Sequence, residues 1–91
     1  MLNMQIMAGE RVERRVAHIL LKLAVRTGKE TEEGTLITVP LSRLDLAEMA
    51  CTTLETCIRT VSRFQKSGLI ATKRGGYILV RNAKELGDLT G

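Results

Sequence analysis

Apolar residues recur at helical spacing near both ends of the chain. Between Glu10 and Arg26 they fall on one face of a predicted helix that Gly28 ends, and basic residues occupy the opposite face. The apolar positions of this helix are Val12, Val16, Ile19, Leu20 and Leu23. A shorter helix that carries Leu86 and Leu89 is predicted after Asn82, whose side chain can cap it.

The first nine residues precede the first helical pattern. Met1–Ala8 is apolar and rich in methionine, and Gly9 interrupts it. Eight residues cannot hold a helix alone in water, so we expect them to be the tail of a longer helix whose beginning is missing, or a disordered end. Residues 10–91 are predicted to form one domain, because so short a chain can bury only one modest core.

The segment Leu41–Ile70 has the pattern of two helices joined by a tight turn. The first helix is predicted to begin at Ser42, whose hydroxyl can cap it. Asp45 follows three residues later as the reciprocal partner of a capping box. The residues expected on its apolar face are Leu44, Ala47, the terminal Ala50 and, as a further candidate, Leu46.

The second helix is predicted to begin at Thr52 or Thr53 and to run to Ser67, where Gly68 can adopt the left-handed conformation that ends helices. If Thr52 is the cap, Glu55 completes a second capping box. Two helices joined by about three residues cross steeply, as in a helix-turn-helix. One face of the second helix then stays free to enter a groove.

Short β segments complete the pattern. Thr35–Val39 is predicted to be a strand, preceded by a polar loop over Lys29–Gly34 and ended by Pro40. Leu69–Thr72 and Tyr77–Val80 flank Gly75-Gly76, which can supply the positive φ angles of a hairpin turn. The sequence therefore predicts a mainly α domain with a small β-hairpin wing, a winged helix-turn-helix.

The positive charge is concentrated in one part of the chain. Residues 49–82 contain six Lys or Arg residues and one acid, Glu55, a net charge of +5, whereas the remainder has eight bases and nine acids. A basic patch on one element is typical of a surface that binds nucleic acid. The alternative is that these side chains only solvate a helix surface.

Four motifs in this region resemble those of a known family. They are Pro40-Leu41-Ser42-Arg43, Asp45-Leu46-Ala47, Glu55-Thr56-x-x-Arg59 and Arg63-Phe64-Gln65-Lys66-Ser67-Gly68-Leu69-Ile70. From about Val12 to its end, the chain resembles the DNA-binding domain of the Crp/Fnr family of bacterial transcription regulators. The last motif is especially similar to the Fnr branch.

The resemblance implies that Glu55 and Arg59 read bases in the major groove. The two residues are one turn apart on one helix face. A carboxylate can accept from cytosine N4, and a guanidinium can donate two hydrogen bonds to guanine O6 and N7. The alternative is that Glu55 only caps its helix and that Arg59 forms an exposed salt bridge with it, which is worth little.

Other positions are assigned weaker roles in binding DNA. Leu54 and Ile58 share the reading face and could contact thymine methyl groups, although Ile58 could instead turn into the core. The resemblance implies that Arg43, Thr53 and Thr56 contact phosphates and fix the register. The basic residues expected over the DNA backbone from the hairpin and the end of the second helix are Lys73, Arg74 and Arg63.

Two residues depart from the family pattern. Cys51 stands where a helix-turn-helix most often has Gly, and it is strained if that turn residue needs a positive φ. Thr60 replaces a larger aliphatic residue and is expected to be solvated or to bond back to a carbonyl. Cys51 and Cys57 are expected to be buried small hydrophobic residues, with a thiol switch as the alternative.

The family carries further parts ahead of this domain: a cyclic-nucleotide-like sensor barrel, a dimerisation helix and, in the Fnr branch, cysteines that hold an iron–sulfur cluster. None of these is found in these residues. Either residues 1–9 are the remnant of the dimerisation helix of a longer protein, which we favour, or the domain stands alone. We expect no cofactor in this segment, because any effector would bind the sensor domain.

The expected partners are double-stranded DNA, a second copy in a full-length homodimer, and RNA polymerase. We expect a cytoplasmic location and no membrane partner, because no apolar run approaches the ~20 residues that span a bilayer. No catalytic activity is expected, since the sequence has no nucleophile–base set. His18 has no metal-ligand spacing to Cys, Asp or Glu.

Two rival functions remain open at this stage. Leu54 and Ile58 could form an apolar patch through which a winged helix docks on another protein. Binding of single-stranded nucleic acid or RNA fits less well, because that mode usually stacks bases on aromatic side chains. The chain offers only Phe64 and Tyr77 for this purpose.

Overall fold

The apolar face of a long N-terminal helix is the surface on which the rest of the chain packs. The computed structural model describes the backbone of residues 2–90 and the side chains of residues 12–90. Helix α1 (Leu2–Thr27) buries Val12, Val16 and Leu20, as the helical pattern predicted. The remaining elements in chain order are β1 (Gly28–Thr31), β2 (Gly34–Ile37), α2 (Arg43–Met49), α3 (Leu54–Lys66), β3 (Ile70–Lys73), β4 (Tyr77–Val80) and α4 (Ala83–Asp88).

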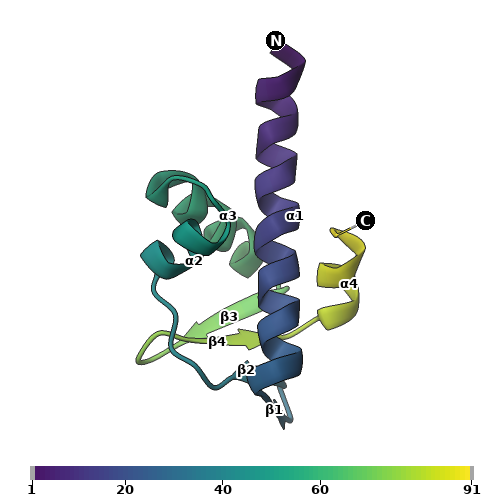
Figure 1. Cartoon of the computed structure of the whole chain (residues 1–91). Helices are drawn as coiled ribbons and strands as arrows, with labels where there is room; N and C mark the ends of the chain where they lie inside the picture. Colours follow the sequence, from purple (N-terminus) through teal and green to yellow (C-terminus); the bar gives the residue numbers. More distant parts are fainter. Residues whose placement is uncertain (1, 91) are drawn as a thin grey trace.

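Helices flank α1 on two sides. In Figure 1, α2 and α3 lie on one side of α1 and α4 lies on the other, and α1 contacts both α3 and α4. The backbone of α1 passes through Gly9 without a break, where the sequence suggested an interruption. The side chains before Val12 lie outside the described residues, and the assignment of residues 1–9 to a dimerisation helix stays a prediction.

The sheet is larger than the predicted hairpin. It has four antiparallel strands in the order β1-β2-β4-β3, in which Ile37 pairs with Ile78 and Ile70 pairs with Val80. Gly75 and Gly76, with φ angles of 89° and 85°, form the turn of the β3–β4 wing. The predicted winged helix-turn-helix is confirmed, and its β3–β4 wing is one half of the four-stranded sheet.

The predicted loop over Lys29–Gly34 is wrong, because its first half forms β1. Every residue of β1 is exposed, so the strand lacks the alternation of apolar and polar residues that marks a strand in sequence. Its order comes from pairing with β2 and from a 2.7 Å hydrogen bond that the Thr35 hydroxyl donates to Glu30 Oε1.

Helix α2 begins with the predicted capping box but faces the core differently. The Asp45 N–H donates to Ser42 Oγ, and the Ser42 N–H donates to Asp45 Oδ2 at 3.0 Å. Leu46 and Ala47 are buried, whereas Leu44 is 53% exposed, so its predicted place on the apolar face is wrong. Residues two apart on an α-helix lie on nearly opposite sides, and burial of Leu46 therefore turns Leu44 outward.

Cys51 lies in the turn between α2 and α3 and has a φ of 53°. Among the non-glycine residues from 2 to 90, only Cys51 has a positive φ. The turn therefore needs the conformation that favours glycine. The side chain is exposed, so the expectation that Cys51 is a buried small residue is wrong. A Cβ in the left-handed region meets the following carbonyl, and this outward-facing residue gains no packing in return.

We expect Cys51→Gly to stabilise the domain by about 0.5–1 kcal/mol, because relief of the left-handed strain exceeds the entropy cost of glycine. Urea unfolding followed by circular dichroism measures the change in free energy of unfolding. Cys51→Ala is the control, since it removes the thiol and keeps the strain. Equal effects of the two substitutions would show that the backbone at this turn is unstrained.

The capping box of α2 predicts a pH dependence of stability. Hydrogen bonding from the Ser42 backbone N–H, with a smaller part from the Ser42 side chain, lowers the pKa of Asp45 below its ordinary value of 3.8. Ionised Asp45 therefore stabilises the folded state above that value, and this stabilisation is lost as the pH falls through the lowered pKa. The stability difference between wild type and Asp45→Asn should shrink below pH 3.8 in urea titrations. A difference that stays constant with pH contradicts the capping role of this carboxylate.

Candidate nucleic-acid interface

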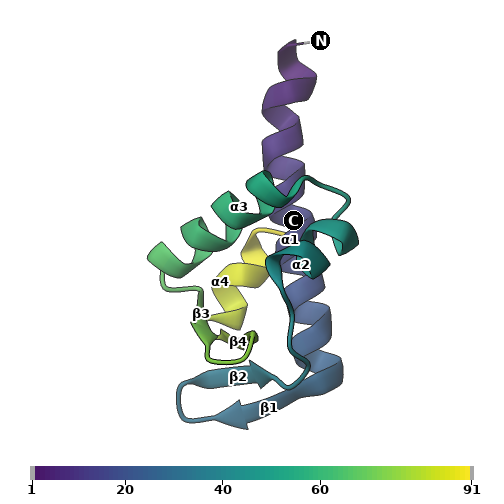
Figure 2. The same cartoon turned by 90° about the vertical axis from the view of Figure 1, so that its left-hand side faces the viewer.

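The exposed face of α3 is defined by where the helix begins. Thr53 is the N-cap, and its hydroxyl oxygen accepts from the Thr56 N–H at 3.2 Å. The alternative start at Thr52, with Glu55 completing a capping box, is therefore wrong. Glu55 takes no part in the cap and lies in the first turn of α3, on its outward face. Figure 2 views the molecule from the side of α1 on which α2 and α3 lie.

Glu55 and Arg59 project together into solvent from this face. Their side chains are 81% and 68% exposed, and Arg59 Nη2 donates to Glu55 Oε1 at 2.8 Å. An exposed ion pair one helical turn apart is worth only about 0.3–0.5 kcal/mol. A stronger hydrogen-bonding partner can therefore compete for either group, and no other part of the described molecule covers them.

Leu54 and Ile58 flank this pair and are also exposed, by 45% and 48%. The alternative in which Ile58 turns into the core is wrong. The inward face of α3 consists of Cys57, Thr60, Val61 and Phe64, all buried. Thr60 donates its hydroxyl to the Thr56 carbonyl at 2.9 Å, which confirms the predicted back-bond and satisfies the buried oxygen.

The residues assigned to phosphates lie around the start of α3 and on α2. Thr53 is exposed at the cap, and its hydroxyl donates to the Thr56 hydroxyl at 2.9 Å. Arg43, in the first turn of α2, is half-buried.

Burial raises the pKa of the Cys57 thiol, and the nearby charge of Arg43 opposes this rise. Cys57 therefore stays a protonated, buried small residue, as predicted.

The basic residues assigned to the DNA backbone differ in their surroundings. Lys73 at the wing lies 3.5 Å from Glu33 in the turn between β1 and β2, and Arg74 beside it is exposed. Arg63 forms an ion pair with Glu13 of α1, although its side chain is still 63% exposed. No local sequence pattern marks either ion pair, since each joins residues that are far apart along the chain.

Arg15 is a positioning residue that the sequence analysis missed. Its Nε donates to the carbonyl oxygen of Ala50 at 2.7 Å, which ties α1 to the end of α2 beside Cys51. The pattern placed Arg15 on the polar side of α1, and it is indeed exposed. Only the tertiary structure shows that it supports the turn that leads into α3.

Among residues 2–90, no helix is long and apolar enough to cross a membrane. Within the same residues, no group of three or more His, Cys, Asp or Glu side chains gathers into a metal site. His18 is exposed on α1, away from the α3 face.

Comparison with known proteins places the chain in a family. The family model described as Crp-like helix-turn-helix domain matches residues 14–89. Electron transport regulator A of Shewanella oneidensis is 34% identical over 86 residues, which cover 94% of this chain and 34% of that protein. The Fumarate and nitrate reduction regulatory protein of Escherichia coli is 30% identical over 86 residues, with the same coverage. The chain thus spans about a third of the length of these curated relatives.

Solved structures agree with this assignment. The Catabolite Activator Protein of Thermus thermophilus is 27% identical, with a TM-score of 0.76, over 98% of this chain and 38% of that one. The CO-dependent transcription factor CooA from Carboxydothermus hydrogenoformans has a TM-score of 0.82 over 87% of this chain and 36% of its own, and at 23% identity it shows the shared fold. The chain therefore belongs to the Crp/Fnr family of transcription regulators, as a Crp-like helix-turn-helix domain.

Proposed function

We propose that this domain binds duplex DNA with α3 in the major groove and that Glu55 and Arg59 read a G·C base pair and its neighbour. The observation that carries the proposal is the exposed Glu55–Arg59 pair on the outward face of α3. An α-helix fits the major groove of B-DNA, where arginine bonds to guanine and a carboxylate accepts from cytosine. Thr53, Thr56 and Arg43 then lie near the phosphates at the edge of the groove, with Arg63, Lys73 and Arg74 over the adjacent backbone.

The longer protein that carries this domain is proposed to act as a symmetric dimer in the cytoplasm, with half-sites about one helical turn apart. RNA polymerase is a further proposed partner. The printed names of three relatives, two regulators and one probable transcriptional activator, support a role in regulation. An isolated domain should bind weakly and with strong salt dependence, since neutralised phosphates dominate its affinity.

Arg59→Ala should cost about 1–3 kcal/mol of binding free energy, and only at one base position, because it removes a bidentate contact to one base. Fluorescence anisotropy against duplexes selected from a random library, each then varied one base pair at a time, measures this specificity. Arg74→Ala is the control: as a backbone contact it should weaken all duplexes alike and reduce the log–log salt slope by about 1. Equal loss for every duplex with Arg59→Ala would show that Arg59 touches only phosphate.

A separate prediction concerns Ile58, one of the two apolar residues beside Glu55 and Arg59. If Ile58 packs on a thymine methyl group, replacing that thymine by deoxyuridine should weaken wild-type binding roughly fourfold, the equivalent of about one buried methylene. Ile58→Ser should bind both duplexes equally. The same anisotropy assay compares the four combinations. An unchanged wild-type affinity for the uracil duplex contradicts the contact.

The same assays separate this proposal from docking on a protein through Leu54 and Ile58. Docking requires that binding to duplex DNA be absent or ignore salt. Replacing Leu54 and Ile58 by serine would then abolish binding to the protein partner. Arg59→Ala would have no base-specific effect.

A further inference from the structure

A second cationic surface lies on α1, and neither the recognition face nor the wing accounts for it. Residues 14–29 contain five Lys or Arg residues and no acid. Arg14, His18, Lys22 and Arg26 recur every fourth residue and are all exposed, so they form one continuous row, here called the α1 ridge. The row spans about 18 Å of helix. The ion pairs found among residues 12–90 involve Glu55, Glu13 and Glu33, and none of them includes a residue of the ridge.

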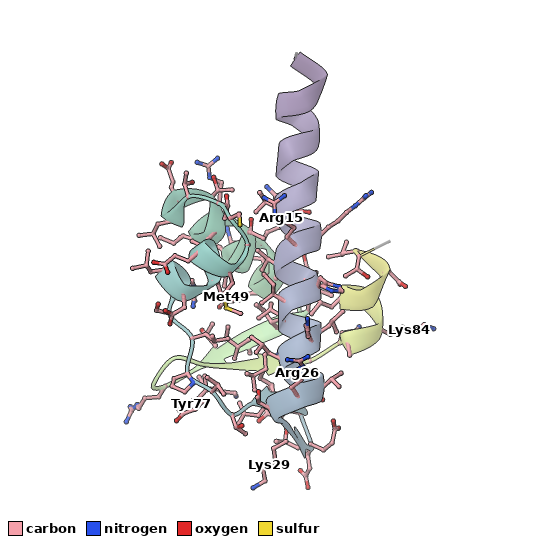
Figure 3. The ribbon with its side chains drawn as sticks, viewed as in Figure 1. Arg15, Arg26, Lys29, Met49, Tyr77 and Lys84 are labelled. Atoms are coloured by element: carbon pink, nitrogen blue, oxygen red, sulfur yellow. The ribbon has the colours of Figure 1, made fainter. Side chains whose placement is uncertain are left out.

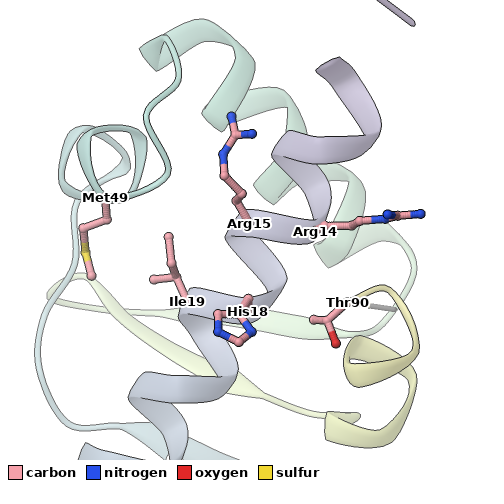
Figure 4. Close-up of a pocket in the computed structure, with 6 residues that line it drawn as sticks. All are labelled: Arg14, Arg15, His18, Ile19, Met49 and Thr90. Carbon is pink, nitrogen blue, oxygen red and sulfur yellow. The ribbon is translucent and has the colours of Figure 1, made fainter. Parts of the chain in front are cut away.

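Apolar side chains border the ridge on both of its sides. On one side a groove runs between α1 and α2, and Ile19, Leu23 and Met49 line it together with ridge residues. Figure 4 shows Ile19 projecting from α1 toward Met49, with His18 beside it. On the other side Leu21 and Val25 line a second hollow. Met49 is 47% exposed and Val25 is 86% exposed.

The surface therefore offers the three positive charges of Arg14, Lys22 and Arg26 between two apolar strips. It lies on the side of α1 opposite the buried stripe of Val12, Val16 and Leu20, and it shares no residue with the outward face of α3. In Figure 3, Arg15 and Arg26 extend from the front of α1, with Met49 of α2 beside them. A bound molecule can occupy this surface without covering Glu55 or Arg59.

We propose that the α1 ridge and its bordering groove bind an acidic amphipathic helix of a partner protein. Charge complementarity favours an anionic occupant, because the ridge carries three positive charges, on Arg14, Lys22 and Arg26, and residues 14–29 contain no acid. The groove requires an apolar one, since burial of Met49, Val25 and Ile19 gains free energy only against apolar atoms. Phosphate backbones supply the charge without the apolar contacts. A helix with leucines on one stripe and carboxylates beside it supplies both, in the helix-in-groove mode.

The test uses an alanine-based peptide of about 16 residues, long enough to become helical on binding, with leucines at i, i+3, i+4 and i+7 and glutamates flanking that stripe. Titrated into the ¹⁵N-labelled domain, it should shift the NMR signals of residues 14–26 and Met49 and leave those of residues 53–60 unchanged. A peptide with lysines in place of the glutamates should not bind. A peptide of the same composition with scrambled leucines should bind at least roughly fivefold more weakly, because only the stripe fills the groove.

Charge reversal in the ridge supplies the matched variants. Lys22→Glu should weaken binding of the acidic peptide roughly tenfold, because it replaces an attraction by a repulsion at the centre of the row. Lys84→Glu makes the same change on α4, where Lys84 points away from α1 in Figure 3, and should leave the affinity unchanged. Circular dichroism melting confirms that both variants are folded.

Three outcomes overturn the proposal. Absence of peptide binding at millimolar concentration is the first, and equal weakening by Lys22→Glu and Lys84→Glu is the second. The third is a duplex oligonucleotide that shifts residues 14–26 and competes with the peptide, which would make the ridge a nucleic-acid surface. None of these results depends on whether α3 reads bases, so the two proposals fail separately.

Discussion

The burial of the inner face of α3 against α1 is the constraint on which the rest of the structure depends. Val16 and Leu20 of α1, with Val61 and Phe64 of α3, are almost fully buried in one core. Once this face is buried, helical periodicity directs Glu55 and Arg59 outward, because they lie on the other side of α3. Helix α3 also contacts α2 and β3, and β3 leads into the turn of the wing, so this packing positions the basic side chains Lys73 and Arg74.

Two polar contacts from α1 help to position the helix-turn-helix unit. Arg15 holds the Ala50 carbonyl next to the strained turn at Cys51, and Glu13 pairs with Arg63 on α3. Both contacts join the first helix to the helix-turn-helix unit. They couple the orientation of the outward face of α3 to the position of α1.

Local patterns predicted much of the fold and of the exposed face of α3. The spacing of Glu55 and Arg59, the cap at Ser42 and the paired glycines of the wing are all encoded within a few residues, and all were found. Strand β1 was missed because an exposed edge strand has no apolar alternation. Leu44 was misplaced because a helix of seven residues contains too few turns to define its buried side. The contacts of Glu13, Arg15 and Lys73 join distant segments, and no local pattern marks them.

An NMR titration of the ¹⁵N-labelled domain with a selected duplex tests whether α3 enters the major groove. We expect the largest shifts on residues 53–66 and on the wing around Lys73 and Arg74, with intermolecular contacts from the Arg59 side chain to base protons of the major groove. Shifts confined to α1 or α4, with the signals of Glu55 and Arg59 unchanged in the bound state, would contradict this expectation.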